Sequence, residues 1–248
     1  MPTLAIDTCF GAVSVAVGDS SRTNAGPTVL AVRRELRETG HAEALFPMIA
    51  AVIEDVREAT GNPAFAIADV ARLAVTRGPG TFTGVRTGIA AVRGLALALS
   101  KPVAGVSSLS VVAMGARRTL PEADRQRPLT VVMGAGRGWL YLERFAPGPS
   151  LVGDGPRAIS ESSVLDHIGP EAFVVAGTAA GRVADLARDG GRNVIACLAG
   201  LMPDASDLLS CTAAISDDAT TLHPLYLRPP DVRPQAGSSL SRAEHDRK

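Results

Sequence analysis

The sequence predicts an α/β fold, and three observations support this prediction. The first 33 residues contain three extended runs with short links, which predicts an antiparallel meander. From His41 onward, apolar residues recur every three or four positions, as they do on one face of a helix. Short strands and helices then alternate. Three antiparallel strands followed by alternating helices and strands is the order of a ribonuclease-H-like lobe, in which helices cover a mixed sheet.

In the first lobe we expect strands over residues 3–7, 11–19 and 28–33. The helix that begins near His41 has an apolar stripe, which consists of Ala42, Leu45, Phe46, Ile49, Ile53 and Val56. Pro47 lies inside this pattern, so it should kink the helix or delay its start. A strand over 73–76, a helix from about Phe82 to Leu99 and a strand from near Pro102 follow.

After Val106 the pattern restarts in a looser form, which predicts a second, reduced lobe. We expect helices over 108–118, 160–167 and 179–188, and strands over 129–133, 139–145, 172–176 and 193–196. A last helix over 204–215 has Ser206 as its expected cap. The expected domains are an N-terminal lobe over 1–105 completed by 206–230, a second lobe over 106–205, and a disordered tail over 231–248.

Composition narrows the function classes. The chain has 248 residues, 46% of them hydrophobic, and 25 basic against 25 acidic residues, so it has no net positive charge to attract a phosphate backbone. Three widely separated cysteines argue against a disulfide framework and a zinc cluster, and they favour a reducing compartment. The first residues carry no basic export signal, and charged residues and glycines interrupt the most apolar stretch, so we expect a cytoplasmic protein and no membrane span.

The segment RGPGTFTGVRTG, residues 77–88, has the glycines of a phosphate-binding loop but not its chemistry. A Walker loop needs a lysine that is absent here, and a nucleophile elbow needs a serine where Phe82 stands. What remains is a turn followed by a helix capped by Thr81 or Thr83. Such a helix start can hold an anion, or it can be a capped turn with no ligand, and the pattern leaves both open. The candidate anion contacts here are Gly78, Gly80, Thr81 and Thr83.

Small residues form a stripe on the helix that follows this turn. Gly84, Gly88 and Ala91 recur every three or four positions, and a helical glycine costs about 1 kcal/mol relative to alanine, so we expect another backbone to pack closely there. The spacing does not distinguish the protein's own sheet from a partner helix.

Five motifs, in order along the chain, carry a resemblance to a known family. They are LAIDTCFGAVSVAV, HAEALFPMI, RGPGTFTGVRTG, PVAGVSSLS and YLRPP. Together they resemble the TsaB family, also called YeaZ, of bacterial tRNA threonylcarbamoyladenosine biosynthesis proteins. The resemblance implies two actin-like ATPase lobes and a non-catalytic scaffold and activator. It also implies TsaD as the catalytic partner that transfers threonylcarbamoyl to the adenosine next to the anticodon, TsaE as an associated ATPase, and tRNA contact only through the complex.

The resemblance also implies sites. The two helices of the first lobe would pair with the equivalent helices of TsaD or, in a homodimer, with a second copy of the chain. The expected partner-interface residues are His41, Leu45, Ile49, Gly84, Arg86, Gly88 and Ala91. Asp7 and Thr8 occupy the place of the first phosphate hairpin of actin-like ATPases, although Asp7 as a simple turn cap is the favoured alternative. We expect no cofactor on this subunit alone, with ATP or ADP at the interface of the complex.

Two departures bear on catalysis. The catalytic relative holds a metal with a His-x-x-x-His pair, whereas here His41 is followed four residues later by Leu45, so we expect no metal site. Gly134 and Gly136 replace the charged residues of a common Asp-Ala-Arg motif, and Arg137 is a displaced substitute for its arginine. The enzyme alternative is an ATP-dependent phosphotransferase or a peptidase. Its one hint is GTAAG at residues 177–181, which resembles a second phosphate hairpin.

Overall fold

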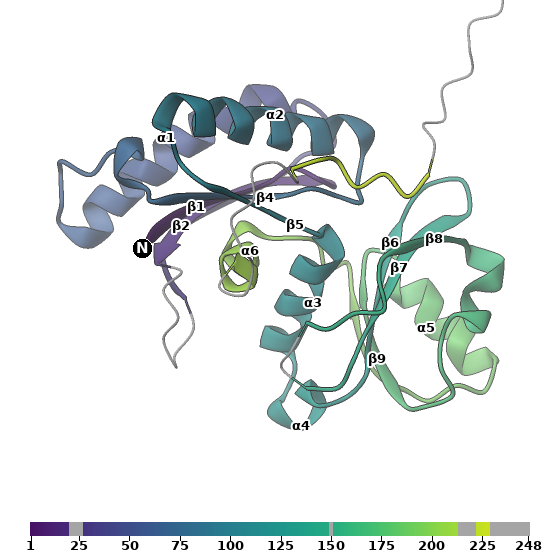
Figure 1. Cartoon of the computed structure of the whole chain (residues 1–248). Coiled ribbons are helices and arrows are strands. Elements are labelled where there is room, and N and C mark those ends of the chain that lie inside the picture. The colour runs from purple at the N-terminus through teal and green to yellow at the C-terminus, as the bar shows by residue number, and fades with distance from the viewer. Residues whose placement is uncertain (20–26, 149–150, 213–221, 229–248) are drawn as a thin grey trace, which may run out of the picture.

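The computed structural model describes residues 1–19, 27–148, 151–212 and 222–228, and its fold is α/β, as predicted (Figure 1). It contains two five-stranded sheets. The first has the order β3-β2-β1-β4-β5, with β1 Pro2–Asp7, β2 Ala12–Asp19, β3 Thr28–Leu36, β4 Arg72–Thr76 and β5 Val103–Val106. The second has the order β10-β9-β6-β7-β8, with β6 Leu129–Gly134, β7 Trp139–Phe145, β8 Arg157–Ser160, β9 Phe173–Gly177 and β10 Val194–Ala199.

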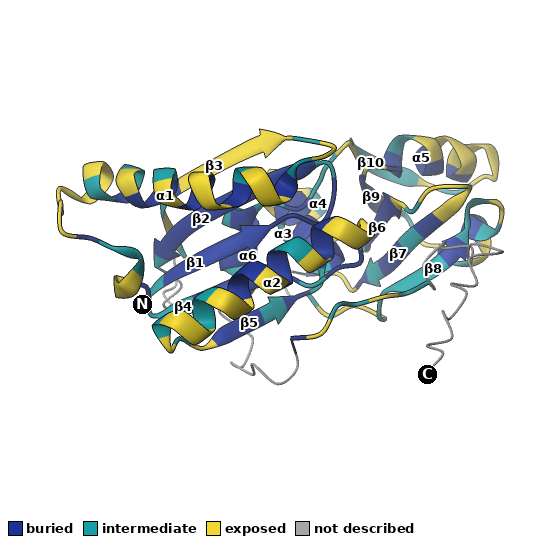
Figure 2. Cartoon of the chain, turned by 90° about the horizontal axis from the view of Figure 1, so that it is seen from above, coloured by how far each residue is buried: buried dark blue, intermediate teal, exposed yellow. Residues whose placement is uncertain are grey.

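The two sheets have the same topology. In each, the first strand pairs antiparallel with the second and parallel with the fourth, the second pairs antiparallel with the third, and the fourth pairs parallel with the fifth. The expected meander and the repeated lobe are therefore both present. In the first sheet, β1, β2 and β4 are buried almost throughout because helices cover both faces (Figures 1 and 2).

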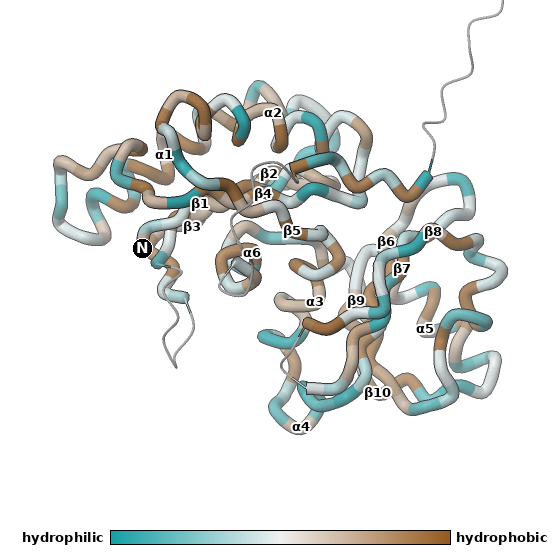
Figure 3. Tube along the Cα trace, viewed as in Figure 1, coloured by the Kyte–Doolittle hydropathy of each residue, from teal (hydrophilic) through white to brown (hydrophobic). Residues whose placement is uncertain are grey.

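Two helices lie side by side on one face of the first sheet. α1 (His41–Thr60) packs on β2 and β3, and α2 (Phe82–Leu99) packs on β4. Each turns its buried residues toward the sheet and leaves an exposed outer face, while apolar residues run along the central strands (Figures 2 and 3). α2 is long and apolar enough to pass a length-and-composition test for a membrane span, a test that core helices of soluble proteins also pass.

Two further helices cross between the sheets. α3 (Ser108–Thr119) follows the first sheet in the chain but packs on β6, β7 and β9 of the second. α6 (Ala205–Thr212) follows the second sheet but packs on β1 and β2 of the first, and it also contacts α3 (Figure 1). α5 (Ala180–Asp189) packs on β9 and β10 of the second sheet. Each sheet is thus completed by a helix from the other part of the chain.

Several elements differ from the sequence prediction. α1 begins at His41 with Pro47 inside it, so the proline does not delay the helix. The expected helix near 160–167 is a 3₁₀ helix, Glu161–Asp166, preceded by the unpredicted strand β8. The short α4 (Glu122–Arg125) and a 3₁₀ turn at Ile67–Asp69 were also not predicted.

The start of α6 corrects a predicted cap. The Asp204 carboxylate accepts the backbone N–H of Ser206 at 2.8 Å, so Asp204 caps this helix and Ser206 lies inside it. Residues 213–215 of the expected helix, and the expected tail over 231–248, lie outside the described residues.

Candidate functional site

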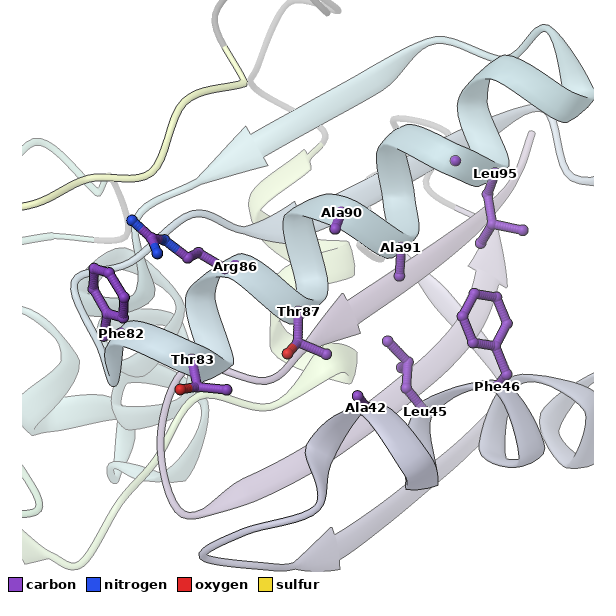
Figure 4. Close-up of a pocket in the computed structure, with 11 residues that line it drawn as sticks. Ala42, Leu45, Phe46, Phe82, Thr83, Arg86, Thr87, Ala90, Ala91 and Leu95 are labelled. Carbon is purple, nitrogen blue, oxygen red and sulfur yellow. The ribbon is translucent and has the colours of Figure 1, made fainter. Parts of the chain in front are cut away.

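An apolar groove of about 880 Å³ runs between α1 and α2 on the outer side of the first sheet (Figure 4). The residues that line it are Ala42, Leu45, Phe46, Phe82, Thr83, Arg86, Thr87, Ala90, Ala91, Gly94 and Leu95. Leu45 and Ala91 are buried, while Phe46 and Phe82 are 55% and 42% exposed. Small residues on the outer face of α2, Ala90 and Gly94, leave the space between the two helices unfilled.

Large apolar side chains at the surface indicate an interaction site when they gather around a concave surface. Here Phe46 stands on the α1 side of the groove and Phe82 at one end of α2 (Figure 4). Among the described residues that line it, Arg86 is the only charged one, so the groove suits an apolar helical surface better than a charged ligand.

Of the seven expected interface residues, three line this groove: Leu45, Arg86 and Ala91. Two others belong to the protein's own packing. His41 is buried, with Nε2 2.9 Å from the carbonyl oxygen of Phe10, and Ile49 is buried in the core of the first lobe. Neither lines the groove.

The expectation that Gly84 and Gly88 face a partner is wrong. A Cβ added at Gly84 would lie 2.0 Å from the carbonyl oxygen of Thr8, and one added at Gly88 would lie 2.6 Å from Thr8 Oγ1. Thr8 Oγ1 also donates a hydrogen bond to the carbonyl of Gly84 at 2.6 Å. The glycines therefore let the turn between β1 and β2 approach the helix closely. The face of α2 that is exposed toward the groove is a different one, and it carries Ala90 and Gly94.

Sequence reasoning missed most of the groove. Ala42 and Phe46 were assigned to the apolar stripe of α1, but their exposure shows that this stripe is wider than the surface the sheet covers. Tyr226 is a second omission. Its ring stacks on Phe82 with centroids 5.8 Å apart, and its hydroxyl accepts a hydrogen bond from Arg86 Nε at 2.7 Å. The signal available in the sequence was the aromatic residue in YLRPP.

The glycine-rich turn and the β1–β2 turn close on each other. Thr81 caps α2 by accepting the N–H of Gly84 at 3.2 Å, and the Thr81 N–H donates to the carbonyl of Cys9 at 2.7 Å. A Cβ at Gly80 would lie 2.4 Å from that same carbonyl oxygen, so the backbones touch. Gly78 has a φ of 98° and precedes a cis proline. Thr83 lies apart from this junction, in the lining of the groove. The N–H groups of Thr81 and Gly84 at the start of α2 are thus engaged by the chain itself.

Asp7 is buried at this junction. Its Oδ1 accepts hydrogen bonds from the Thr76 hydroxyl and, at 3.3 Å, from the N–H of Cys9, which is the geometry of a turn cap. Its Oδ2 is buried without a hydrogen-bond partner in the described structure. Burial raises the pKa of Asp7 to about 6, and the Thr76 hydrogen bond opposes the rise.

The turn between β6 and β7 explains one of the two glycines that replace the expected charges, Gly136. Gly136, Arg137 and Gly138 have φ values of 74°, 51° and 73°, a left-handed backbone that glycine adopts without strain. Gly134 N–H donates to Thr178 Oγ1 at 2.9 Å. Arg137 therefore stands at the tip of a tight turn.

Among the described residues, no group of three His, Cys, Asp or Glu side chains is close enough to hold a metal ion. The three cysteines, all described, are free, and Cys9 and Cys211 are buried.

Two lobes of the same ribonuclease-H-like topology, interlocked by exchanged helices, define a protein of the actin-like ATPase fold class with an open groove on its first lobe. The tRNA threonylcarbamoyladenosine biosynthesis protein TsaB of Escherichia coli (strain K12) is 30% identical over 239 residues, 92% of this chain and 95% of the E. coli protein. YeaZ from Pseudomonas aeruginosa superposes with a TM-score of 0.72 at 28% identity, over 91% of this chain and 99% of that one. The chain therefore belongs to the TsaB (YeaZ) family of tRNA threonylcarbamoyladenosine biosynthesis proteins.

Part of the chain, which includes α1 and α2, also resembles a second family. Residues 32–151 match the family model of TsaD, tRNA N6-adenosine threonylcarbamoyltransferase. The transferase of Jannaschia sp. (strain CCS1) is 38% identical over 100 residues, which are 40% of this chain and 26% of the transferase. The groove residues, 42–95, lie inside the matched range.

Proposed function

We propose that this chain is the non-catalytic scaffold and activator subunit of the complex that transfers threonylcarbamoyl to the adenosine next to the anticodon of tRNA. In this proposal it pairs with the catalytic subunit TsaD through the groove between α1 and α2. The observation that carries the proposal is this apolar groove, which the described parts of the chain leave open.

The kinship of the two families supports the choice of partner. Because the groove lies within the range that matches the transferase family, a transferase would present its own equivalent of α1 and α2. Two related helix pairs can pack face to face as a four-helix arrangement, with the rings of Phe46 and Phe82 entering the opposite pair. For the same reason a homodimer on this face is the competing assembly.

The surroundings of His41 support a non-catalytic role. Its Nε2 is engaged by the Phe10 carbonyl, and the residue one helical turn later, Leu45, forms part of the groove wall. A pair of imidazoles for a metal is thus replaced by one packed histidine and one apolar contact.

The remaining assignments follow from the same scheme. We propose that the chain alone holds no cofactor and that ATP or ADP enters at the interface with TsaD. The ATPase TsaE joins that pair, and tRNA is contacted only through the complex. We assign this work to the cytoplasm.

The test is light scattering after size-exclusion chromatography on the chain alone and mixed with TsaD from the same organism. A one-to-one complex is expected for the natural sequence. Ala90→Glu places a charge in the groove without touching the core and should weaken binding roughly 100-fold, because the carboxylate would lose its water in the closed interface and would compete with Phe82 and Tyr226 for Arg86, one helical turn away. Ala98→Glu, on the same helix but outside the groove, is the matched control.

Two results would contradict the proposal. If the natural sequence does not associate, with or without ATP and TsaE, the pairing is wrong, and ATP turnover by the isolated chain would then favour the phosphotransferase alternative. If Ala90→Glu and Ala98→Glu bind equally well, the chain pairs through another face.

A further inference from the structure

A short C-terminal segment, residues 222–228, crosses from the first lobe to the second (Figure 1). Its first residue, Leu222, is buried in the core, and the Leu222 carbonyl accepts a hydrogen bond from Arg93 on α2 at 2.6 Å. The N–H of Leu225 donates to the carbonyl of Arg77 at 2.7 Å. The segment is thus tied to the first lobe by packing and by backbone hydrogen bonds.

Tyr226 connects this segment to the groove. Its hydroxyl and ring contact Arg86 and Phe82, as described above, and the Arg86 guanidinium carbon lies 3.5 Å from the centroid of the Phe82 ring. Both partners line the groove, and Tyr226 itself is 46% exposed. A hydrogen bond from a charged donor and a stacked ring together restrict the rotamers of Phe82 and Arg86. The end of the groove therefore takes its shape from a residue 140 positions beyond Arg86.

Arg228 connects the same segment to the second lobe. Its guanidinium carbon lies 4.6 Å from the centroid of the Trp139 ring, and its NH1 donates to the carbonyl of Ala135 at 3.3 Å. Ala135 lies in the turn between β6 and β7, and Trp139 is the first residue of β7, directly after that turn. Tyr226 and Arg228 are two residues apart, and two residues of chain span at most about 7 Å. A displacement of Tyr226 therefore also moves Arg228, except for the part that a change in the backbone dihedral angles between them compensates.

From this geometry we infer that residues 222–228 form a strap that links the groove to the β6–β7 turn, with Tyr226 as the positioning residue for docking. A partner that enters the groove must meet Phe82 and Arg86, and so it acts on Tyr226 and, through Arg228, on the second lobe. By thermodynamic reciprocity, the position of the β6–β7 turn then affects the affinity for the partner. This inference rests on the proposed function for the identity of the partner, but the link between Tyr226 and Trp139 exists without it.

Trp139 is the only tryptophan of the chain, so its fluorescence reports on the strap directly. In the free chain, Arg228→Ala uncovers the ring and should increase quenching of Trp139 by acrylamide. Tyr226→Ala should increase it in the same direction, although Tyr226 does not stack on Trp139 in the structure. His223→Ala, an exposed position of the same segment, is the matched control and should leave quenching unchanged. Equal quenching in Tyr226→Ala and His223→Ala would overturn the link.

The second measurement adds TsaD and follows Trp139 emission, with Trp139→Phe in the same complex providing the partner's own signal for subtraction. We expect binding to shift Trp139 emission in the natural sequence and to leave it unshifted in Tyr226→Ala. Tyr226→Ala should also raise the Kd about tenfold, because Phe82 and Arg86 would no longer be held in place before binding and their rotamers would have to be fixed when the partner docks.

The outcomes separate the two proposals. A complex that forms with unchanged Trp139 emission, or that binds Tyr226→Ala as tightly as the natural sequence, overturns the strap and leaves the proposed function standing. If no complex forms while Tyr226→Ala still alters quenching in the free chain, the proposed pairing fails and the strap stands as an internal link between the lobes.

Discussion

Replacing Gly84 with alanine tests the packing at the centre of the first lobe. The new Cβ would lie 2.0 Å from the carbonyl oxygen of Thr8 and 2.6 Å from Thr81 Oγ1. The first contact is with backbone in the β1–β2 turn, so a side-chain rotation cannot relieve it. The helix or the turn must move, which also strains the hydrogen bond from Thr8 Oγ1 to the Gly84 carbonyl.

The magnitude follows from two opposing effects. Overpacking a tight site costs about 1–3 kcal/mol and occasionally more, and alanine recovers up to about 1 kcal/mol because it is the better helix former. Since the clash is with backbone, we place the cost at the upper end and expect a net loss of about 2–3 kcal/mol. Gly94→Ala is the matched control, because a Cβ there meets nothing within 4 Å on the same helix. It should stabilise the protein by about 0.5–1 kcal/mol.

The assay is equilibrium unfolding in urea, monitored by circular dichroism, for Gly84→Ala, Gly94→Ala and the natural sequence. Their midpoints are compared on the condition that the dependence of the unfolding free energy on urea concentration is the same in all three. We expect the two variants to move the midpoint in opposite directions. A Gly84→Ala protein that is as stable as the natural one would refute the packing described for this helix face. The same result would reopen the possibility that the glycine stripe faces a partner.

Two further predictions concern buried carboxyl groups. Burial raises the pKa of Asp7 from 3.8 to about 6, so the folded protein binds this proton more tightly than the unfolded chain does. The protonated carboxyl therefore stabilises the fold below about pH 4, and this stabilisation is lost as the pH rises through about 6. The shift in pKa corresponds to about 3 kcal/mol of unfolding free energy. Unfolding measured at several pH values should therefore show Asp7→Asn gaining stability relative to the natural protein between about pH 4 and 7. A stability gap between the two proteins that stays constant over this range would contradict the burial of Asp7. Arg118 on α3 donates from Nε to Asp207 on α6 at 2.8 Å, and Arg118→Met would leave that buried carboxylate without its cation. We expect a loss of about 1–3 kcal/mol in a thermal melt, and no loss would show that this contact contributes nothing to the joining of the crossed helices.

Much of the secondary structure could be predicted because it depends on neighbours in the sequence. The alternation of Val13, Val15 and Val17 predicted β2, and the helix predicted from Phe82 to Leu99 has those bounds in the structure, with Thr81 as its cap. Strand periodicity and helix capping act over two to four residues, so a sequence displays them directly. The prediction failed where elements were short, as at β8, because four residues carry too little pattern.

The groove could not be predicted in the same way. The spacing of Gly84 and Gly88 indicated a close approach of backbone, but not which backbone, because the direction of a helix face depends on where the sheet lies. Likewise, Ala42 and Phe46 recur with the same period as the buried residues of α1. Only the structure shows that the first sheet covers a narrower part of α1 than this apolar stripe and leaves both residues exposed.

The sequence by itself determined the α/β class, the order of most elements and, through five motifs, the family. The tertiary structure alone decided that the glycine stripe packs on Thr8, that α3 and α6 exchange sheets, and that Tyr226 meets Phe82 and Arg86. The physical reason is the separation along the chain of the residues that interact. Periodicity and capping arise between near neighbours, whereas these contacts join segments far apart in the chain and exist only once both sheets have formed and their helices have packed.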